Sequence, residues 1–349
     1  MNLNFLVNNT FANDIAIDLG TDMTYIYIKG NGIVVREPSY IAYDTNTHEI
    51  QACGTDARNM LGKNPPSITV SSPVVNGVVS DHTLASLMLK NFISKSCPKT
   101  LLKPRVVVTV PSDSTDVEKR ALSLALQQSG AREVYFIETP IAAAVGAGCD
   151  ISLARGMLVA NLGGGRCDVC SISLGHSVIK NSITTAGRAF CFEITKYIKK
   201  KYNLNIGELS ADTIKRELGC AAPFDRTKTL SVTGCDTTSG LPRAISINSE
   251  EIRDVLSPLV LQIASVIRTT LEETPPELQS DILEDGILIT GTDANIYGLD
   301  KFLRTELNIK VFIADSPEEC GAKGAGEELS RLDIANDGEK YCYTMYEIQ

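Results

Sequence analysis

The N-terminal part of the chain carries a strand pattern. Apolar and polar residues alternate through residues 13–35 (NDIAIDLGTDMTYIYIKGNGIVV), and glycine-containing turns at 20–21 and 30–32 interrupt the alternation. This pattern predicts antiparallel strands joined by tight turns. The run at 103–112 (KPRVVVTVPS) is instead apolar on both faces, as in a strand buried inside a parallel sheet.

Helices and strands alternate through the rest of the chain. Residues 114–130 have helical periodicity, and we expect Ser114 to cap this helix and Gly130 to end it. A strand and a helix of small residues follow at 132–148. The second half begins with a strand-turn-strand unit at 156–174 and ends with a strand, a glycine turn and a helix at 285–303. Between them we expect helices at 190–203, 210–218 and 248–278. Ser210 should cap the second of these helices, and Pro258 should kink or break the third. This alternation predicts an α/β protein.

Composition narrows the functional classes. The 349 residues exceed what one hydrophobic core usually serves, so we expect two domains or one bilobed domain. A formal charge of −9 argues against broad electrostatic binding of nucleic acid, and no nucleic-acid partner is expected. Apolar runs fall short of the roughly 20 residues of a membrane-spanning helix, and the N-terminal residues predict no secretory signal.

Ten cysteines are scattered along the chain, and we interpret them as reduced thiols that pack in the core. Cys167 and Cys170 form the one close pair, in a run that reads as a strand. Residues three apart on a strand face opposite sides, so core packing is favoured over a metal or redox site. The three histidines have no plausible cysteine or carboxylate partner in sequence for a catalytic triad or a multi-histidine metal site.

The two strand-turn-strand units resemble each other. Residues 17–28 (IDLGTDMTYIYI) align without gaps on 160–171 (ANLGGGRCDVCS), which places Asp18 on Asn161. Such an internal similarity predicts two similarly built domains that face one another. Glycine turns let backbone N–H groups approach a phosphate, and an acid before the turn can hold Mg²⁺ through water. Ordinary hairpins are the alternative for either turn alone, but the pair favours a nucleotide held between lobes.

The chain is similar to MreB, the bacterial actin homologue family that directs cell shape, over roughly residues 14–332. The segments that carry the resemblance are DLGTDMTYIYIKGNGIVVREPSYIA, KPRVVVTVPSDSTDVEKRAL, AREVYFIETPIAAAVGAG, IKKKYNLNIGELSADTIKRELG and TPPEL. The resemblance implies an actin-like fold of two lobes around a nucleotide cleft, each with a large and a small subdomain. The implied divisions are lobe I at 14–150 with its small subdomain at about 34–80, lobe II at 151–332 with its small subdomain at about 190–250, and a peripheral tail at 333–349.

The resemblance also implies ATP or ADP as ligand and assigns cleft residues by position. Asp18 is expected to hold Mg²⁺ through water, although the need for Mg²⁺ is itself in question. The implied nucleotide contacts are Gly20, Thr21, Asp22 and Met23 in the first phosphate loop, Gly163, Gly164, Gly165 and Arg166 in the second, Glu208, Ala211 and Lys215 around adenine and ribose, and Gly291 and Thr292 in a further glycine turn.

The departures from the family pattern fall on catalytic chemistry. Asn161 replaces an acid, and Thr139 stands before Pro140 where the family has its water-positioning glutamate, although Glu138 is retained beside it. Losing positioning groups of this kind costs about two to four powers of ten in rate. We therefore expect ATP hydrolysis to be weak or lost. Three smaller departures are Met23 in place of an asparagine, Gly187-Arg188-Ala189 in place of an acidic GDE stretch, and the turn GTDA at 291–294 in place of GGGA.

Two arginines enter the site where the family keeps neutral or acidic residues. Arg166 and Arg188 add positive charge, and their guanidinium groups could neutralise phosphate in place of Mg²⁺. The alternative is that both point to solvent or form ion pairs, which are common and weak at surfaces. The sequence leaves both interpretations open.

Membrane and polymer functions come from the resemblance and from one loop. The family implies self-association into filaments at the inner face of the cytoplasmic membrane, possible MreB paralogues and the cell-wall elongation machinery as partners, and a cytoplasmic, peripheral location. Leu101 and Leu102 lie among basic residues and are candidates for membrane insertion, unless they begin the following strand. The N-terminal LNFLV is a weaker candidate. Alternative functions are an ordinary polymerising ATPase and a non-polymerising paralogue that modulates a true MreB.

Overall fold

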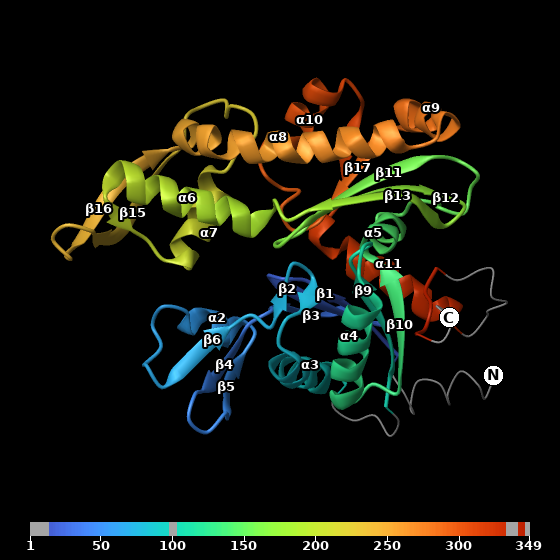
Figure 1. Cartoon of the computed structure of the whole chain (residues 1–349), viewed down its shortest axis with the longest axis horizontal. Coiled ribbons are helices and arrows are strands. Elements are labelled where there is room, and N and C mark those ends of the chain that lie inside the picture. Colours follow the sequence, from blue (N-terminus) through green and yellow to red (C-terminus); the bar gives the residue numbers. More distant parts are fainter. Residues whose placement is uncertain (1–13, 98–102, 333–340, 346–349) are drawn as a thin grey trace.

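The computed structural model describes residues 14–97, 103–332 and 341–345. Two five-stranded sheets dominate this part of the chain, one in each lobe (Figure 1). The lobe I sheet has the order β10 (Glu133–Glu138), β9 (Arg105–Val110), β1 (Ile15–Leu19), β2 (Met23–Ile28) and β3 (Gly32–Pro38). The lobe II sheet has the order β18 (Val311–Ile313), β17 (Ile287–Thr290), β11 (Met157–Leu162), β12 (Cys167–Ser173) and β13 (His176–Ile183).

The two sheets have the same topology. In each, an antiparallel meander (β1-β2-β3 or β11-β12-β13) is extended from its first strand by parallel strands. Both sheets therefore place the first strand of the meander at the centre. The alignment of 17–28 with 160–171 is thus matched by two equivalent sheets, and the β-branched run after residue 103 becomes the parallel strand β9.

Helices α5 (Thr139–Gly146) and α11 (Cys320–Arg331) lie between the two sheets (Figure 1). Their small residues permit close packing, since a Cβ added to Gly146 would collide with the backbone carbonyl of Cys320. Apolar residues of both sheets, such as Ala16 and Val159, share one core with these helices. Helix α11 belongs to the predicted lobe II division at 151–332 and returns to pack against β1 and β9 of lobe I.

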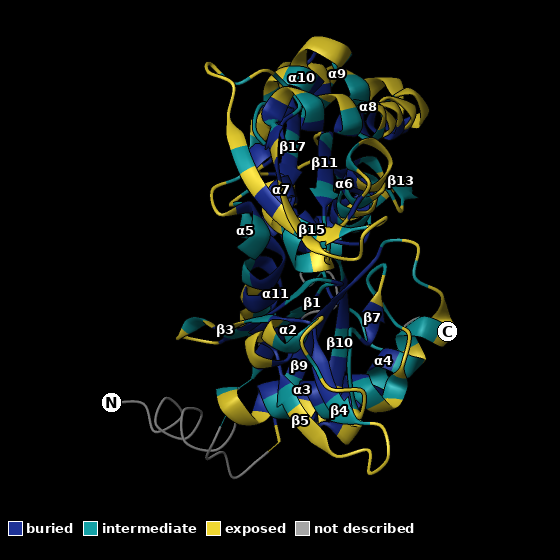
Figure 2. Cartoon of the chain, turned by 90° about the vertical axis from the view of Figure 1, so that its left-hand side faces the viewer, coloured by how far each residue is buried: buried dark blue, intermediate teal, exposed yellow. Residues whose placement is uncertain are grey.

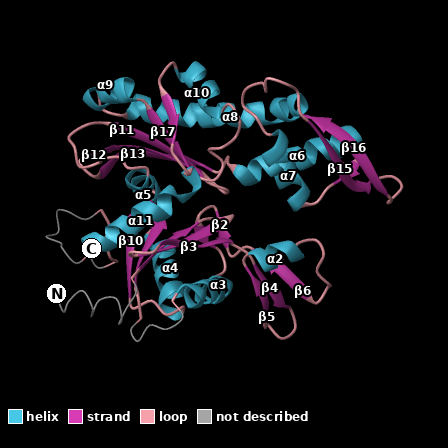
Figure 3. Ribbon diagram, turned by 180° about the vertical axis from the view of Figure 1, so that it is seen from behind, coloured by secondary structure: helices cyan, strands magenta, loops and turns pink. Residues whose placement is uncertain are grey.

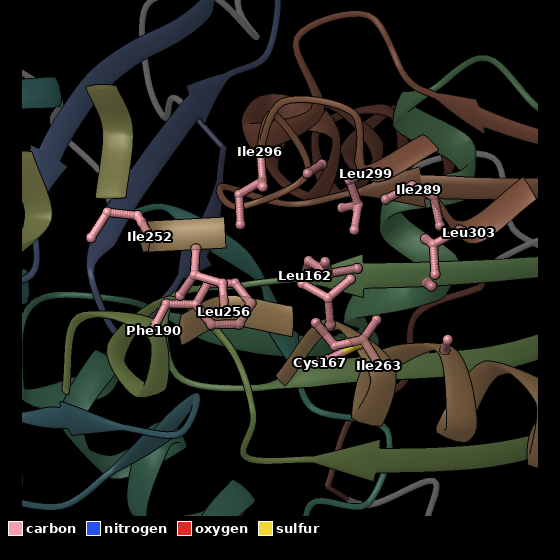
Figure 4. Close-up of a cluster of buried hydrophobic side chains, with 14 of the residues drawn as sticks. Leu162, Cys167, Phe190, Ile252, Leu256, Ile263, Ile289, Ile296, Leu299 and Leu303 are labelled. Carbon is pink, nitrogen blue, oxygen red and sulfur yellow. The ribbon is translucent and has the colours of Figure 1, made fainter. Parts of the chain in front are cut away.

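Further helices cover the outer faces of the sheets. On lobe I these are α3 (His82–Ser96) and α4 (Asp116–Gln128), and on lobe II α6 (Gly187–Tyr202), α8 (Ser249–Glu273), α9 (Pro276–Asp285) and α10 (Leu299–Leu307). Figure 2 shows burial concentrated on the sheets and the middle layer. In Figure 4, Phe190 of α6 and Leu256 and Ile263 of α8 lie with Leu162 and Cys167 of the lobe II sheet in one apolar cluster.

A small subdomain extends from each lobe on the same side of the molecule (Figure 3). In lobe I, β4 (Ile41–Asp44) pairs with β5 (Ile50–Cys53) and β6 (Ile68–Ser71) beside α2 (Thr55–Met60). In lobe II, β14 (Leu204–Asn205), β15 (Thr229–Asp236) and β16 (Pro242–Asn248) lie near α7 (Glu208–Leu218). A two-stranded hairpin of β7 (Val74–Val75) and β8 (Val78–Val79) turns at Asn76-Gly77, where both residues have positive φ as such a two-residue turn requires.

Helix starts differ from the predicted ones in two places. Thr115, not Ser114, caps α4, and Thr115 and Glu118 each accept a hydrogen bond from the other's backbone N–H. This reciprocal capping box fixes the helix start one residue later than expected. Gly207, not Ser210, is the N-cap of α7, so that helix begins earlier than the polar residues indicated.

Helix α8 runs through Pro258 without a break, contrary to one of the two predicted outcomes. Pro258 is exposed, so the backbone carbonyl that loses its helical N–H partner can be solvated. By length and composition alone α8 is apolar enough to cross a membrane. Its buried residues, including Ile252, Leu256 and Ile263, pack in the lobe II core, and we interpret it as a core helix.

The described part of the predicted peripheral tail contacts the lobe I sheet at one residue. Tyr343 pairs with Phe136 of β10 through two backbone hydrogen bonds of 2.7 and 2.9 Å. Cys342 beside it is buried. Tyr343 therefore forms an isolated bridge to the edge strand of the lobe I sheet. The interpretation of the close cysteine pair agrees with the structure, because Cys167 and Cys170 are buried in different cores on opposite faces of β12.

Candidate functional site

Two glycine turns of equivalent geometry begin the site. In the β1–β2 turn, the Gly20 N–H donates to the Met23 carbonyl oxygen at 3.0 Å, and in the β11–β12 turn the Gly163 N–H donates to the Arg166 carbonyl oxygen at 2.9 Å. A side chain at Gly20 would place its Cβ 2.7 Å from the Met23 oxygen. Glycine therefore permits the tight form of the first turn, and the second repeats the same closing hydrogen bond.

The two turns contact each other across the cleft between the lobes. A Cβ added to Gly164 would overlap the Asp22 carboxylate, and one added to Gly165 would lie 2.5 Å from Thr21 Oγ1. Thr21 Oγ1 also accepts a hydrogen bond of 2.9 Å from the Gly77 N–H of the β7–β8 turn. Three backbone turns thus converge at one end of the cleft.

The cleft has a wide end and a narrow end. The wide end is a cavity of about 650 Å³ lined by Tyr40, Phe192, Glu208, Ala211 and Lys215, among others. That volume lies within the range of small-molecule sites. The narrow end is a cavity of about 70 Å³. Of the residues predicted from sequence, it is lined by Asp18, Gly20, Thr21, Asp22, Met23, Thr139, Asn161, Gly163, Gly164, Gly165, Arg166, Gly291 and Thr292.

The two residues that precede the glycine turns are held by threonines of neighbouring strands. Thr109 Oγ1 donates to Asp18 Oδ1 at 2.6 Å, and Thr290 Oγ1 donates to Asn161 Oδ1 at 3.1 Å. Burial raises the pKa of Asp18 above its ordinary value, and the Thr109 hydrogen bond partly opposes that shift. Asp18 and Asn161 therefore occupy equivalent places, but only Asp18 can offer an anionic ligand.

The position expected to orient the attacking water carries a threonine hydroxyl instead of a glutamate carboxylate. Thr139 begins α5 at the narrow end, and its hydroxyl donates to the Val110 carbonyl oxygen at 3.0 Å. The neighbouring Glu138 is turned toward β13, where its carboxylate binds Lys180 and accepts a hydrogen bond from the Ser177 hydroxyl at 2.6 Å. Glu138 does not line the narrow cavity, so it does not substitute for the missing glutamate.

Arg166 forms an ion-pair network rather than a free cationic group. Its Nε is 2.8 Å from Asp168 Oδ1 and its Nη2 is 2.6 Å from Asp113 Oδ1, while Nη1 donates to the Asn76 carbonyl oxygen at 3.3 Å. The Arg166 side chain is 14% exposed and that of Asp168 is 2% exposed. Burial raises the pKa of Asp168 to about 6, although Arg166 opposes the shift. Arg166 thus connects the second glycine turn to Asp113 and the β7–β8 turn of lobe I.

Arg188 makes a second ion pair across the cleft. Its Nε is 2.8 Å from Asp22 Oδ1, and its Nη2 donates to the Thr21 carbonyl oxygen at 3.0 Å. Of the two interpretations left open by sequence, the structure therefore shows ion pairs. Asp22 and Asp168 line the cleft, whereas Asp113 is 58% exposed and lines neither cavity.

The small subdomains also bond to each other at the wide end. The Tyr40 hydroxyl donates to Glu208 Oε1 at 2.6 Å, and Arg58 Nη2 is 2.5 Å from Asp212 Oδ2. Sequence reasoning missed Arg58 and Asp212, whose separation in the chain gives no local signal. Lys215, predicted near adenine and ribose, is buried and 2.6 Å from Asp293 Oδ1.

Other site residues that sequence reasoning missed had usable signals. Asn76-Gly77 between paired valines is a strong hairpin signal, from which a turn could have been predicted. Asp293 belongs to the altered GTDA turn in the sequence, but its burial could be recognised only in the structure. The predicted membrane residues Leu101 and Leu102, and the N-terminal LNFLV, lie outside the described residues.

A sequence comparison places these features in a family. The sequence model of the MreB/Mbl protein family matches residues 12–337. The cell shape-determining protein Mbl of Bacillus subtilis (strain 168) is 42% identical over 324 residues, which span 93% of this chain and 97% of Mbl. MreB of Escherichia coli (strain K12) is 40% identical over 330 residues, 93% of this chain and 95% of that protein.

Solved structures agree with the sequence comparison. MreB5 of Spiroplasma citri bound to ADP matches with a TM-score of 0.89 at 34% identity, over 93% of this chain and 99% of that chain. A second MreB5 structure, bound to AMPPNP, matches with the same TM-score. A MamK chain from a double helical filament, 18% identical with a TM-score of 0.78, shares the fold. The predicted actin-like fold is confirmed, and the chain belongs to the MreB/Mbl family of cell shape-determining proteins.

Proposed function

We propose that the cleft binds an adenine nucleotide, with the base in the wide cavity and the phosphates between the two glycine turns. The observation that carries this proposal is the convergence of two equivalent glycine turns at the narrow end of a cavity of about 650 Å³. Exposed backbone N–H groups in such turns favour anionic ligands. The MreB5 structures bound to ADP and AMPPNP support the same assignment.

Magnesium fits this arrangement better than the arginines do. Both Arg166 and Arg188 are already paired with carboxylates, so neither offers uncompensated charge to a phosphate. Asp18 lines the narrow end, and no lysine or arginine engages it among the residues that the structure describes. Mg²⁺ is commonly bound by one or two carboxylates, water and substrate phosphates. Asp18 would hold such an ion through water, and the ion would supply positive charge that neutralises the phosphates.

We propose that hydrolysis is slow or absent. A threonine hydroxyl cannot act as a general base at neutral pH, and the Thr139 hydroxyl is already directed at the Val110 carbonyl. Asn161 supplies no charge for the hydrated metal. Phosphoryl transfer depends on positioning and on electrostatic stabilisation, and both are reduced here. Nucleotide would then act as a structural ligand or a slow switch.

Membership of a cell shape-determining family supports a cytoskeletal role, and we propose filaments on the inner face of the cytoplasmic membrane with Leu101 and Leu102 as the membrane contact. A second candidate function is a non-polymerising paralogue that modulates a true MreB. The degenerate positions Thr139 and Asn161 favour that candidate, since a modulator needs no hydrolysis.

Calorimetric titration of the full chain with ADP and ATP tests nucleotide binding, and the same titration in EDTA tests the metal. We expect binding with Mg²⁺ and a large loss without it. Retention of full affinity in EDTA would instead favour charge neutralisation by the arginines. No binding under either condition would contradict the proposed function.

Phosphate release tests the catalytic assignment through Thr139→Glu. We expect little release by the natural chain and an increase of about 10²-fold in the variant, the size of one restored positioning group. Thr139→Val is the matched control, because it keeps the shape and adds no carboxylate. Rapid release by the natural chain would show that Thr139 suffices.

Electron microscopy with ATP, with ADP and without nucleotide separates the two candidate functions. Filaments of the pure chain support the cytoskeletal role, whereas changes seen only in a mixture with a typical MreB support the modulator. Sedimentation with anionic liposomes tests the membrane contact. We expect Leu101→Ser combined with Leu102→Ser to abolish sedimentation, and unchanged sedimentation would exclude that pair.

A further inference from the structure

Three ion pairs join the two lobes across the cleft, and we call them the cross-lobe pairs. They are Asp22 with Arg188 at 2.8 Å, Asp113 with Arg166 at 2.6 Å and Arg58 with Asp212 at 2.5 Å. In each pair one residue belongs to lobe I and the other to lobe II. A further hydrogen bond supports the second pair, because the Ser182 hydroxyl of lobe II donates to Asp113 Oδ2 at 3.0 Å.

The cross-lobe pairs are distributed along the cleft. Arg166 lines the narrow cavity, Arg58 and Asp212 line the wide cavity, and Asp22 lines both. The apolar core around α5 and α11 also joins the lobes, but apolar contacts have no preferred direction. Hydrogen-bonded ion pairs depend on distance and angle. The cross-lobe pairs therefore restrict the angle between the lobes in a way that the apolar core does not.

One of these pairs connects the same two glycine turns that the proposed phosphates would connect. The Arg188 backbone N–H donates to the Gly164 carbonyl oxygen at 2.7 Å, which attaches this residue to the turn of lobe II. The Arg188 side chain reaches Asp22 and the Thr21 carbonyl oxygen in the turn of lobe I. A phosphate between the turns would join the lobes through a ligand, whereas Arg188 joins them through the protein itself.

We propose that the cross-lobe pairs are a latch that holds the lobes closed, so that closure of the cleft does not depend on nucleotide. All the contacts of the latch are made by groups of the chain, and no ligand takes part in them. The statement about nucleotide rests on the proposed nucleotide binding: ADP enters the cleft and leaves the angle between the lobes unchanged. Arg166 and Arg188, which depart from the family pattern, thereby have a role that does not involve phosphate.

The latch can be broken without leaving a buried charge unpaired. Arg188→Ala leaves Asp22, which is 30% exposed and can be solvated. Arg58→Ala leaves Asp212, which keeps its ion pair with Arg216 at 3.0 Å. Both changes therefore remove a contact between the lobes with little effect inside either lobe.

The third pair is best broken from the side of lobe I. Asp113→Ala leaves Arg166 paired with the buried Asp168, so the interior of lobe II keeps its charge balance. The triple variant combines this change with Arg188→Ala and Arg58→Ala. A matched control removes the same charges, two positive and one negative, from ion pairs that lie within lobe II: Arg155→Ala, Arg268→Ala and Asp285→Ala.

Small-angle X-ray scattering of the full chain, measured on the monomer fraction as it leaves a size-exclusion column, tests the latch. We expect the natural chain to have the same radius of gyration with and without Mg²⁺ and ADP. The triple variant should have a larger radius without nucleotide, because its lobes separate, and ADP should reduce that radius. The control variant should behave as the natural chain does.

Folding is checked by circular dichroism. If the triple variant does not fold, the double variant Asp113→Ala with Arg188→Ala replaces it, and Arg268→Ala with Asp285→Ala is then the control. The inference is wrong if ADP makes the natural chain more compact, if the latch variant has the natural radius without nucleotide, or if the control expands equally. Absence of ADP binding in calorimetry would contradict the proposed function alone, since the nucleotide-free comparison of the variants still decides whether the latch exists.

Discussion

Removal of the Arg166 side chain should destabilise the protein far more than removal of a typical surface arginine. Arg166 is the counter-ion of Asp168, which is 2% exposed, and the same guanidinium bonds Asp113 and Ser182. Arg166→Ala leaves a buried carboxylate without its positive partner. Breaking a buried ion pair in this way costs about 3–5 kcal/mol, because the remaining charge stays desolvated. For lobes of this size that corresponds to a fall in melting temperature of roughly 6–20 °C.

The loss of stability in Arg166→Ala should depend on pH, and the pKa of Asp168 decides whether that loss grows or shrinks as the pH rises. Its folded-state pKa of about 6 lies above the ordinary value of 3.8, so the folded state binds more protons than the unfolded state between these values. The corresponding contribution to stability is present at low pH and lost as the pH rises through about 6, and amounts to about 3 kcal/mol. Without Arg166 the pKa of Asp168 should rise further. The difference between the natural chain and Arg166→Ala should therefore be small near pH 4 and grow above pH 6.

Thermal melts followed by circular dichroism at several pH values measure this effect. Arg268→Ala is the matched control, because Arg268 is 47% exposed and pairs with Glu306 at the surface, where such pairs contribute about 1 kcal/mol or less. Arg166→Ala combined with Asp168→Asn should recover most of the loss, since the remaining side chain is neutral. A loss no larger than that of Arg268→Ala, or one that is the same at every pH, would refute the reasoning.

Two further changes test packing and helix structure. Gly146→Ala should destabilise the protein by at least about 1–3 kcal/mol, because the new Cβ meets the Cys320 backbone rather than a movable side chain. Chemical denaturation measures this loss. Gly207→Ala is the control, because its Cβ meets nothing within 4 Å. Pro258→Ala should raise the melting temperature, because it restores a helical N–H in the middle of α8 where proline costs about 3 kcal/mol, and an unchanged or lower value would contradict this account.

Local patterns predicted much of the fold. The alternation in residues 13–35 predicted the antiparallel strands β1, β2 and β3, and the apolar run at 103–112 predicted the parallel strand β9. The gapless match of Asp18 to Asn161 predicted two equivalent turns, which close with equivalent hydrogen bonds. These features depend on near neighbours, so a single sequence contains them.

Features that depend on distant contacts were not predictable in the same way. The C-terminal tail looked irregular because Tyr343 has no local partner, yet its partner is Phe136 in another element. Arg166 was recognised as unusual, but whether it met phosphate or carboxylate depended on Asp113, which the fold brings from lobe I. The predicted cap of α4 was wrong for a more local reason. Ser114 and Thr115 are adjacent hydroxyl residues, and only the backbone geometry selects Thr115 as the cap.

The arginines and the carboxylates of the cleft are best understood together. Arg166 and Arg188 are compensated within the protein, which leaves Asp18 at the narrow end as a carboxylate that no lysine or arginine engages among the described residues. A carboxylate beside phosphates requires a cation between them. The same ion pairs that withdraw the arginines from the phosphates therefore make the proposed nucleotide site depend on a divalent ion.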